Sequence, residues 1–134
     1  MAFTTLMGAK VRRREDPRLI TGRATYVDDV QVVGLLHAAF VRSPYAHAKI
    51  RRIDLTAAKN APGVVGVWAA ADLRAAGLDV SMPVAADIPG MLKPPHPPLG
   101  TDEVHFVGEA IVMIVAEGQY AARDAAEAVV VEYD

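Results

Sequence analysis

The sequence predicts an α+β fold in which a mixed sheet carries short helices packed on it. Two observations lead to this prediction. Short apolar runs rich in valine and isoleucine recur along the chain and end at glycine or proline, as is typical of strands. Alanine-rich stretches with apolar residues at helical spacing lie between several of these runs. At 134 residues the chain has the length of a single domain (1–134), with an N-terminal arm expected over residues 1–23.

The first half of the chain contains three predicted strands, over residues 35–42, 46–54 and 64–69. The alternation is imperfect in the second strand, because Arg52 shares a face with Ala48 and Ile50 while Ile53 falls on the other face. Three short helices are expected: one at residues 16–20, one that begins with Thr56 as its N-cap, and one at residues 70–76. Each is followed closely by a glycine.

The second half begins with the segment 82–100, whose six prolines exclude a regular helix or strand and predict a loop. Strands are predicted at 104–107, 110–117 and 129–133, with a helix at 119–128. The strand at 110–117 is too apolar to face water on either side. The strand–helix–strand order fits an α+β fold or a single βαβ unit.

Composition bounds the function. Charged residues make up 22% of the chain, hydrophobic ones 52%, and the net charge is −2, so nothing indicates binding to nucleic acid or to a membrane surface. The chain has no cysteine, which excludes disulfides, thiolate nucleophiles and cysteine-ligated zinc or iron–sulfur clusters within it. The N-terminal residues lack the apolar stretch of a secretory signal, and we expect a cytoplasmic location.

The polar residues form no catalytic, cofactor-binding or metal-ligating pattern. His37, His47, His96 and His105 lack the spacing of a metal site; we expect His37 to be half-buried and hydrogen-bonded, His96 solvated, and His105 on the polar face of a strand. The adjacent carboxylates Asp28 and Asp29 favour a turn or cap role over an acid/base dyad. The clusters Arg12–Arg14 and Arg51–Arg52 indicate a solvated arm and a charged strand edge, or else a contact with a phosphate or a partner carboxylate.

Several stretches, in order, carry a more specific signal. They are TGRATYVDD (21–29), VRSPYAHAKI (41–50), APGVVGV (61–67), AADL (70–73), FVGEAIVMIVAE (106–117) and a tail with Ala125, Ala126, Ala128, Val129, Val131 and Tyr133. Together they resemble the opening domain of the molybdenum-binding large subunit of the aldehyde oxidase/xanthine dehydrogenase family, in its aerobic carbon monoxide dehydrogenase-like branch. The resemblance covers about residues 12–134, and the proline-rich loop is its least family-like part.

This resemblance implies an α/β hammerhead domain that packs against the domains holding the cofactor. The family's catalytic glutamate and its motifs around molybdenum lie downstream of such a domain, so the chain alone is expected to carry no catalytic residue. The assembly is expected to use a molybdenum cofactor of the molybdopterin cytosine dinucleotide type, 2Fe–2S clusters and FAD, all held elsewhere. The expected partner is the molybdenum-cofactor domain or subunit of the same complex.

Two functional hypotheses follow. The first is a non-catalytic domain or small subunit of a molybdopterin-dependent hydroxylase or dehydrogenase, with Asp134 at a domain edge. The second is a stand-alone scaffold that self-associates without a molybdenum partner, since its apolar strands leave surface to be covered.

The candidate partner interface is formed by Phe106, Val107, Gly108 and Glu109. A glycine between two predicted strands suggests a positive φ, a bulge, or the close approach of another backbone. Glu109 is expected to find a local partner, such as an arginine or backbone N–H groups, or to fix the orientation of a partner domain. From the sequence alone, Glu109→Ala should leave the isolated domain nearly as stable and weaken assembly.

Overall fold

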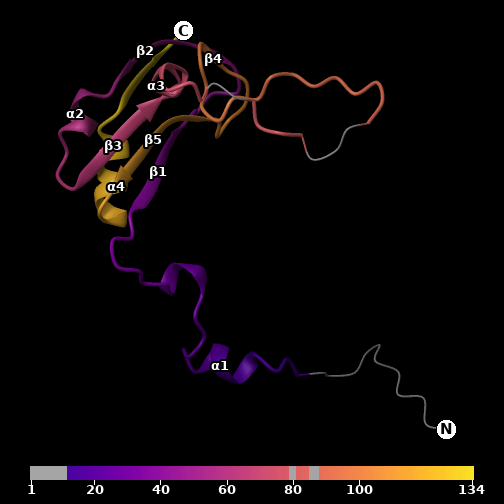
Figure 1. The fold of residues 1–134 in the computed structure, drawn as a ribbon, viewed down its shortest axis with the longest axis vertical. Helices are drawn as coiled ribbons and strands as arrows, with labels where there is room; N and C mark the ends of the chain where they lie inside the picture. The colour runs from indigo at the N-terminus through magenta and orange to yellow at the C-terminus, as the bar shows by residue number, and fades with distance from the viewer. Residues whose placement is uncertain (1–11, 79–80, 85–87) are drawn as a thin grey trace. The chain divides into compact units, whose positions relative to one another are not determined.

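The computed structural model describes residues 12–78, 81–84 and 88–134 (Figure 1). Contacts within the chain group into two units, one up to Val33 and the other from Gly34 to Asp134. All six strands, and every described residue that is buried, belong to the second unit. This second unit therefore contains the fold that positions the candidate interface.

The described part of the first unit, residues 12–33, consists of two short helices. Helix α1 (Asp16–Ile20) has Pro17 in its first turn and is followed by Gly22 at a φ of +68°. In the 3-10 helix η1 (Val27–Asp29), the Tyr26 N–H donates to Asp29 Oδ2 over 2.9 Å. The predicted helix at 16–20 is confirmed, and so is the cap role for Asp29 of the acidic pair.

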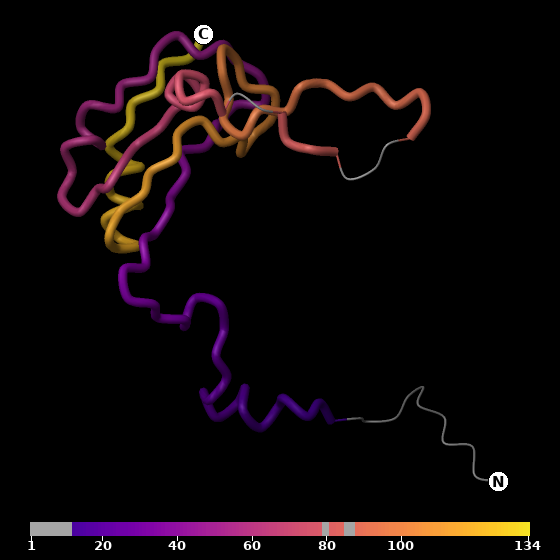
Figure 2. Tube along the Cα trace, in the orientation of Figure 1, coloured from indigo at the N-terminus to yellow at the C-terminus, as the bar shows by residue number. Residues whose placement is uncertain are grey.

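The first sheet of the second unit has the order β1-β5-β3 and is antiparallel throughout. Its strands are β1 (His37–Arg42), β5 (Ala110–Ala116) and β3 (Val64–Ala69). Figure 2 shows β5 running between two strands that both precede it in the sequence. Because β5 is the central strand, its Ile111, Val112 and Ile114 are fully buried, as its apolar sequence predicts.

The second sheet has the order β4-β2-β6, with β4 (Glu103–Val104), β2 (Ala48–Asp54) and β6 (Val130–Tyr133). The pairing of β2 with β6 shifts register between Ile50 and Arg52, so Arg51 is an extra residue in a β-bulge. The bulge turns both Ile50 and Ile53 toward the core, where both pack. This explains why the sequence of β2 alternates imperfectly.

Helices α2 (Thr56–Lys59) and α4 (Gln119–Glu127) pack against the first sheet, and α3 (Ala70–Ala75) follows β3 directly. Small residues make this possible, because Ala58, Ala122 and Ala125 are buried and let the helices approach closely. The alanine stripe predicted for residues 119–128 is confirmed as the buried face of α4. Within the described residues, no helix is long and apolar enough to cross a membrane.

The α+β fold class and its short helices are confirmed, while three expectations require correction. The strands form two antiparallel sheets instead of one mixed sheet. Helix α4 links β5 to β6, which lie in different sheets, so the βαβ alternative is wrong. At α2 the capping side chain belongs to Asp54, whose Oδ1 accepts from the Thr56 N–H over 3.0 Å, and not to Thr56.

The predicted strand at 104–107 is also wrong beyond Val104, because residues 105–108 form a bend and turn. There the Glu109 carboxylate accepts a hydrogen bond from the His105 N–H and takes that donor away from any strand ladder. Gly108 then adopts a φ of +92°, which ends extended backbone.

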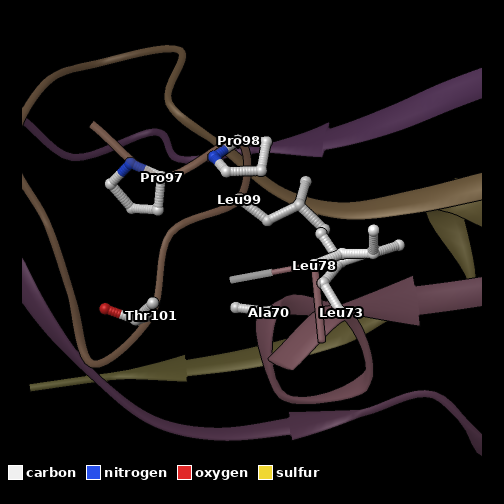
Figure 3. A pocket seen from close by; sticks show the side chains of 7 residues that line it. All are labelled: Ala70, Leu73, Leu78, Pro97, Pro98, Leu99 and Thr101. Carbon is white, nitrogen blue, oxygen red and sulfur yellow. The ribbon is translucent and has the colours of Figure 1, made fainter. Parts of the chain in front are cut away.

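The proline-rich loop contains no helix or strand in its described parts, residues 82–84 and 88–100, as predicted. Two hydrogen bonds link His96 to the start of the loop. The Met82 N–H donates to the His96 carbonyl over 2.7 Å, and the His96 N–H donates to the side-chain Oγ of Ser81 over 2.8 Å. Leu99 is buried and, with Pro97 and Pro98, faces Leu73 and Leu78 across a small pocket (Figure 3). The pocket has a volume of only about 10 Å³, which is too small for a ligand. Burial of Leu99 there anchors the end of the loop.

Candidate partner interface

The turn at residues 105–109 connects β4 to the central strand β5 and contains all four candidate residues. The Glu109 N–H donates to the Phe106 carbonyl over 3.2 Å, which closes the turn around Gly108. The positive φ suggested for Gly108 is confirmed. Among the described residues, no atom other than those of its chain neighbours lies within 4 Å of where its Cβ would be, so none of them makes the close backbone approach at that position that was the alternative.

Hydrogen bonds join this turn to the end of β1. Ser43 and the turn exchange two backbone hydrogen bonds of 2.8 Å, from the Gly108 N–H to the Ser43 carbonyl and from the Ser43 N–H to the Glu109 carbonyl. A third bond runs from an Arg42 guanidinium N–H to the Gly108 carbonyl, also over 2.8 Å. The turn is therefore held at a fixed position on the fold.

Ser43 is the buried centre of this attachment, with only 2% of its surface exposed. Its hydroxyl donates to the Tyr45 carbonyl and accepts from the Tyr45 N–H, which forms a local turn after β1. The Tyr45 ring meets the Tyr133 ring edge-on at 5.0 Å between centroids. Burial raises the pKa of the Tyr133 phenol, while its hydrogen bond with Ser43 acts in the opposite direction. Sequence reasoning missed the role of Ser43, for which Ser-Pro after a strand is the only local signal.

The four candidate residues divide into two with exposed side chains and two that shape the turn. Phe106 and Val107 are 46% and 64% exposed, so two apolar side chains project from a rigid turn. Glu109 is only 6% exposed, and its carboxylate accepts from the His105 N–H. Of the two roles expected for Glu109, the geometry favours a hydrogen-bond partner within the chain. The carboxylate therefore stabilises the turn. Phe106 and Val107 are the residues able to contact another molecule.

Two histidines and a glutamate lie beside the turn. Glu103 is within 3.3 Å of His47 Nε2 and 3.4 Å of His105 Nε2, and its pairing with Lys49 of β2 brings the histidines together. These side chains are all partly exposed. The expectation that His105 lies in a strand is wrong, but its side chain is exposed, as a position on a polar face implied. Sequence spacing could not reveal this cluster, because only the β2–β4 pairing unites positions 47 and 103. Among the residues that the structure describes, no group is arranged to hold a metal ion.

A broad groove opens between the turn and the proline-rich loop, with a volume of about 1110 Å³. Its lining includes His105, Phe106 and Glu109 of the turn and residues of the loop such as Met91 and His96. The His96 ring meets the Phe106 ring edge-on at 6.2 Å between centroids. The exposed apolar side chains Met82, Val84, Met91 and Leu92 line the groove together with Phe106.

The remaining sequence candidates are arginines and histidines. Arg51 pairs with Asp134 at 3.2 Å, and Arg52 pairs with Asp54 at 2.9 Å, so both have carboxylate partners within the chain. His37 is half-buried as expected, and His96 is exposed. Arg12–Arg14 are exposed in the first unit. These ion pairs favour solvated arginines over a contact with a phosphate or a partner carboxylate, but the expected strand edge is wrong, because β2 is the central strand of its sheet.

Comparison with protein families matches residues 21–134 to the hammerhead domain of aldehyde oxidase and xanthine dehydrogenase. This chain belongs to the aldehyde oxidase and xanthine dehydrogenase family. The hammerhead domain is 43% identical to the nicotine 6-hydroxylase large subunit of Paenarthrobacter nicotinovorans, over 96% of its own length and 16% of that protein. It is 40% identical to the carbon monoxide dehydrogenase large chain of Afipia carboxidovorans, again over 96% of its length and 15% of that protein.

Solved structures agree with the hammerhead assignment. Quinoline 2-oxidoreductase from Pseudomonas putida 86 superposes with a TM-score of 0.79 at 41% identity, over 92% of this chain and 16% of that one. The Cu,Mo-carbon monoxide dehydrogenase superposes with a TM-score of 0.75 at 39% identity, over 95% of this chain and 15% of that one. The hammerhead domain thus spans a small part of each relative, and the expected resemblance is confirmed.

Proposed function

We propose that this hammerhead domain is a non-catalytic component of a molybdenum-dependent hydroxylase or dehydrogenase. Its role is to pack against the domain or subunit that holds the molybdenum cofactor. Membership of the family supports this role, together with the length of the relatives, of which this segment is 15–16%. The cofactor of the assembly would be of the molybdopterin cytosine dinucleotide type, with 2Fe–2S clusters and FAD in other domains or subunits, in the cytoplasm.

The observation that carries the proposal is the turn at 105–109, which presents Phe106 and Val107 on a rigid base. Exposed apolar side chains that are held rigidly lose little conformational entropy on binding, so they are suited to anchor a partner. Arg42 and Ser43 hold the turn in place, and Glu109 supports it from inside. Phe106 and Val107 therefore form the contact, while Gly108 and Glu109 shape it.

The proposal is tested by capture of a partner. The probe is the nicotine 6-hydroxylase large subunit from Paenarthrobacter nicotinovorans, made without the segment that matches this chain. A competent probe must bind its own segment back. We expect the full 134-residue chain to be captured, and the double variant Phe106→Ser, Val107→Ser to be captured at least tenfold more weakly with an unchanged melting temperature.

Glu109→Ala serves as a comparison variant. Because the buried carboxylate supports the turn, we expect this variant to lose thermal stability as well as capture, in contrast to the expectation from the sequence. Equal capture of the wild type and the Phe106, Val107 double variant would contradict the proposed contact. If the chain elutes as a dimer that the double variant disrupts, the self-associating scaffold becomes the better account.

A further inference from the structure

The sheet β1-β5-β3 has an outer face that the core does not use. Successive residues of a strand point to opposite faces, and the rows that contain Val112 and Ile114 point into the core. The two rows that alternate with them point outward, and they consist of Ala38, Val115 and Gly66 in one row and Phe40, Met113 and Trp68 in the other. Within the described part of the chain, none of these six residues belongs to the core cluster or packs against it.

The outer face is apolar. An antiparallel sheet that is covered on one side normally carries polar residues on the other. None of these six residues has a charged side chain, and the indole of Trp68 is their only N–H or O–H donor on a side chain. Phe40 is 42% exposed, and Met113, Val115 and Trp68 are half-buried. The only charged neighbour along β1 is Arg42 at the rim, whose guanidinium lies 5.5 Å from the centre of the Phe40 ring. An apolar outer face on such a sheet indicates that another surface covers it, since the exposed side of an antiparallel sheet is ordinarily polar.

The size of the face argues against a second copy of this chain as its occupant. Three strands about 4.8 Å apart, over five residues of about 3.4 Å each, present roughly 250 Å². A stable interface buries about 800 Å² on each partner. An occupant must therefore contact other parts of the domain at the same time, as a larger chain can. In the relatives, this segment accounts for only 15–16% of such a chain.

We propose that the outer face of β1-β5-β3 is a second docking surface, covered by an apolar layer of the larger polypeptide that carries the cofactor. The inference rests on the proposed function and adds a contact on a different surface from the 105–109 turn. Arg42 connects the two surfaces, since its guanidinium lies over Phe40 and also donates to the Gly108 carbonyl. A carboxylate or carbonyl on the partner, opposite Arg42, would complete the rim of the interface.

The test uses Trp68, which is the only tryptophan in the chain. The full chain is labelled with 5-fluorotryptophan and gives a single fluorine resonance, which is titrated with the unlabelled nicotine 6-hydroxylase probe described above. We expect this resonance to shift on binding, as the ring loses contact with water. Phe40→Gln should weaken capture about tenfold, and Ala38→Gln should act in the same direction; Tyr120→Gln on the exposed side of α4 is the matched control and should have no effect.

The outcomes separate this inference from the proposed function. If the chain is captured while the Trp68 resonance stays in place and Phe40→Gln binds as well as the wild type, the outer face is free and the inference is wrong, although the proposed function stands. No capture by a competent probe would overturn both. If the resonance instead moves with the concentration of the chain alone, in step with dimer formation by light scattering, a second copy covers the face and the proposal fails. A spectrum of Phe40→Gln that matches the folded wild type excludes misfolding. If Phe40→Gln proves unstable, the capture of Ala38→Gln is used instead to decide whether the outer face binds the probe.

Discussion

Gly108 combines a φ of +92° with open space around the position of its missing side chain. A Cβ there would meet no atom of the described residues, so the strained backbone conformation is the cost of a substitution that this geometry shows. We expect Gly108→Val to lower the free energy of unfolding by about 1–3 kcal/mol. Gly108→Asn is the control, because asparagine tolerates a positive φ better than a β-branched residue, and should cost less. Chemical denaturation measures both, and equal costs would show that backbone strain is not the cause.

Asp54 supplies a second prediction at the scale of one residue. Hydrogen bonds from the Thr56 N–H and then its hydroxyl, followed by the charge of Arg52, lower the pKa of the Asp54 carboxyl from its ordinary value of 3.8. A lowered pKa means that the stabilising contribution is present above the unfolded-state value and is lost as the pH falls through the folded-state value. Asp54→Asn should therefore melt below the wild type near neutral pH.

The difference in melting temperature between the wild type and Asp54→Asn should shrink as the pH falls below about 4. Glu132→Gln is a control, since its carboxylate lies 4.0 Å from Arg52 and caps no helix. A difference that persists unchanged to pH 2 would contradict the assigned role of the carboxylate.

The residues of the site differ in how well the sequence predicts their conformation and burial. The positive φ of Gly108 follows from its being glycine between two apolar runs. The burial of Glu109 does not, because the sequence cannot tell which backbone N–H lies near a carboxylate. The attachment through Ser43 depends on residues more than sixty positions apart, and it becomes visible only when β1 and β5 are paired.

At the scale of elements, strands and helices with strong patterns are predicted well. Helix α4 has a regular alanine stripe, and β5 has an unbroken apolar run, so both agree with prediction. The stretch after Val104 looks like a strand by composition, but the side chain of Glu109 and the conformation of Gly108 end it. Pairing is not encoded in periodicity, which is why two sheets could not be distinguished from one.

Trp68 and Gly66 give a test of the outer face at this scale. A Cβ on Gly66 would lie 2.2 Å from the Trp68 ring, so the ring can lie flat on β3 only because residue 66 is glycine. Gly66→Ala should displace the ring, change the tryptophan emission and destabilise the domain by about 1–3 kcal/mol. The same substitution in a Trp68→Leu background should cost much less. If the two costs are equal, the contact between ring and glycine contributes nothing.

At the scale of the whole molecule, the domain is expected to act only within a larger assembly. Purified alone, the full chain should bind no molybdenum, iron or flavin and should not reduce dyes with aldehydes, purines or carbon monoxide. Elemental analysis and absorption spectra of the purified chain measure this, with a complete relative such as a carbon monoxide dehydrogenase as positive control. Stoichiometric molybdenum in the isolated chain would contradict the non-catalytic role.

The central position of β5 has a consequence for the time course of synthesis. Strands β1 and β3 leave the ribosome well before β5, and neither pairs with the other in the finished sheet. Until residue 116 has emerged, both strands lack the partner that satisfies their backbone groups and covers their apolar side chains. Such non-local pairing is slow to form and leaves unpaired strand edges exposed to other chains. The nascent chain is thus most vulnerable to aggregation while the proline-rich loop is being made, and the arrival of one strand ends that interval.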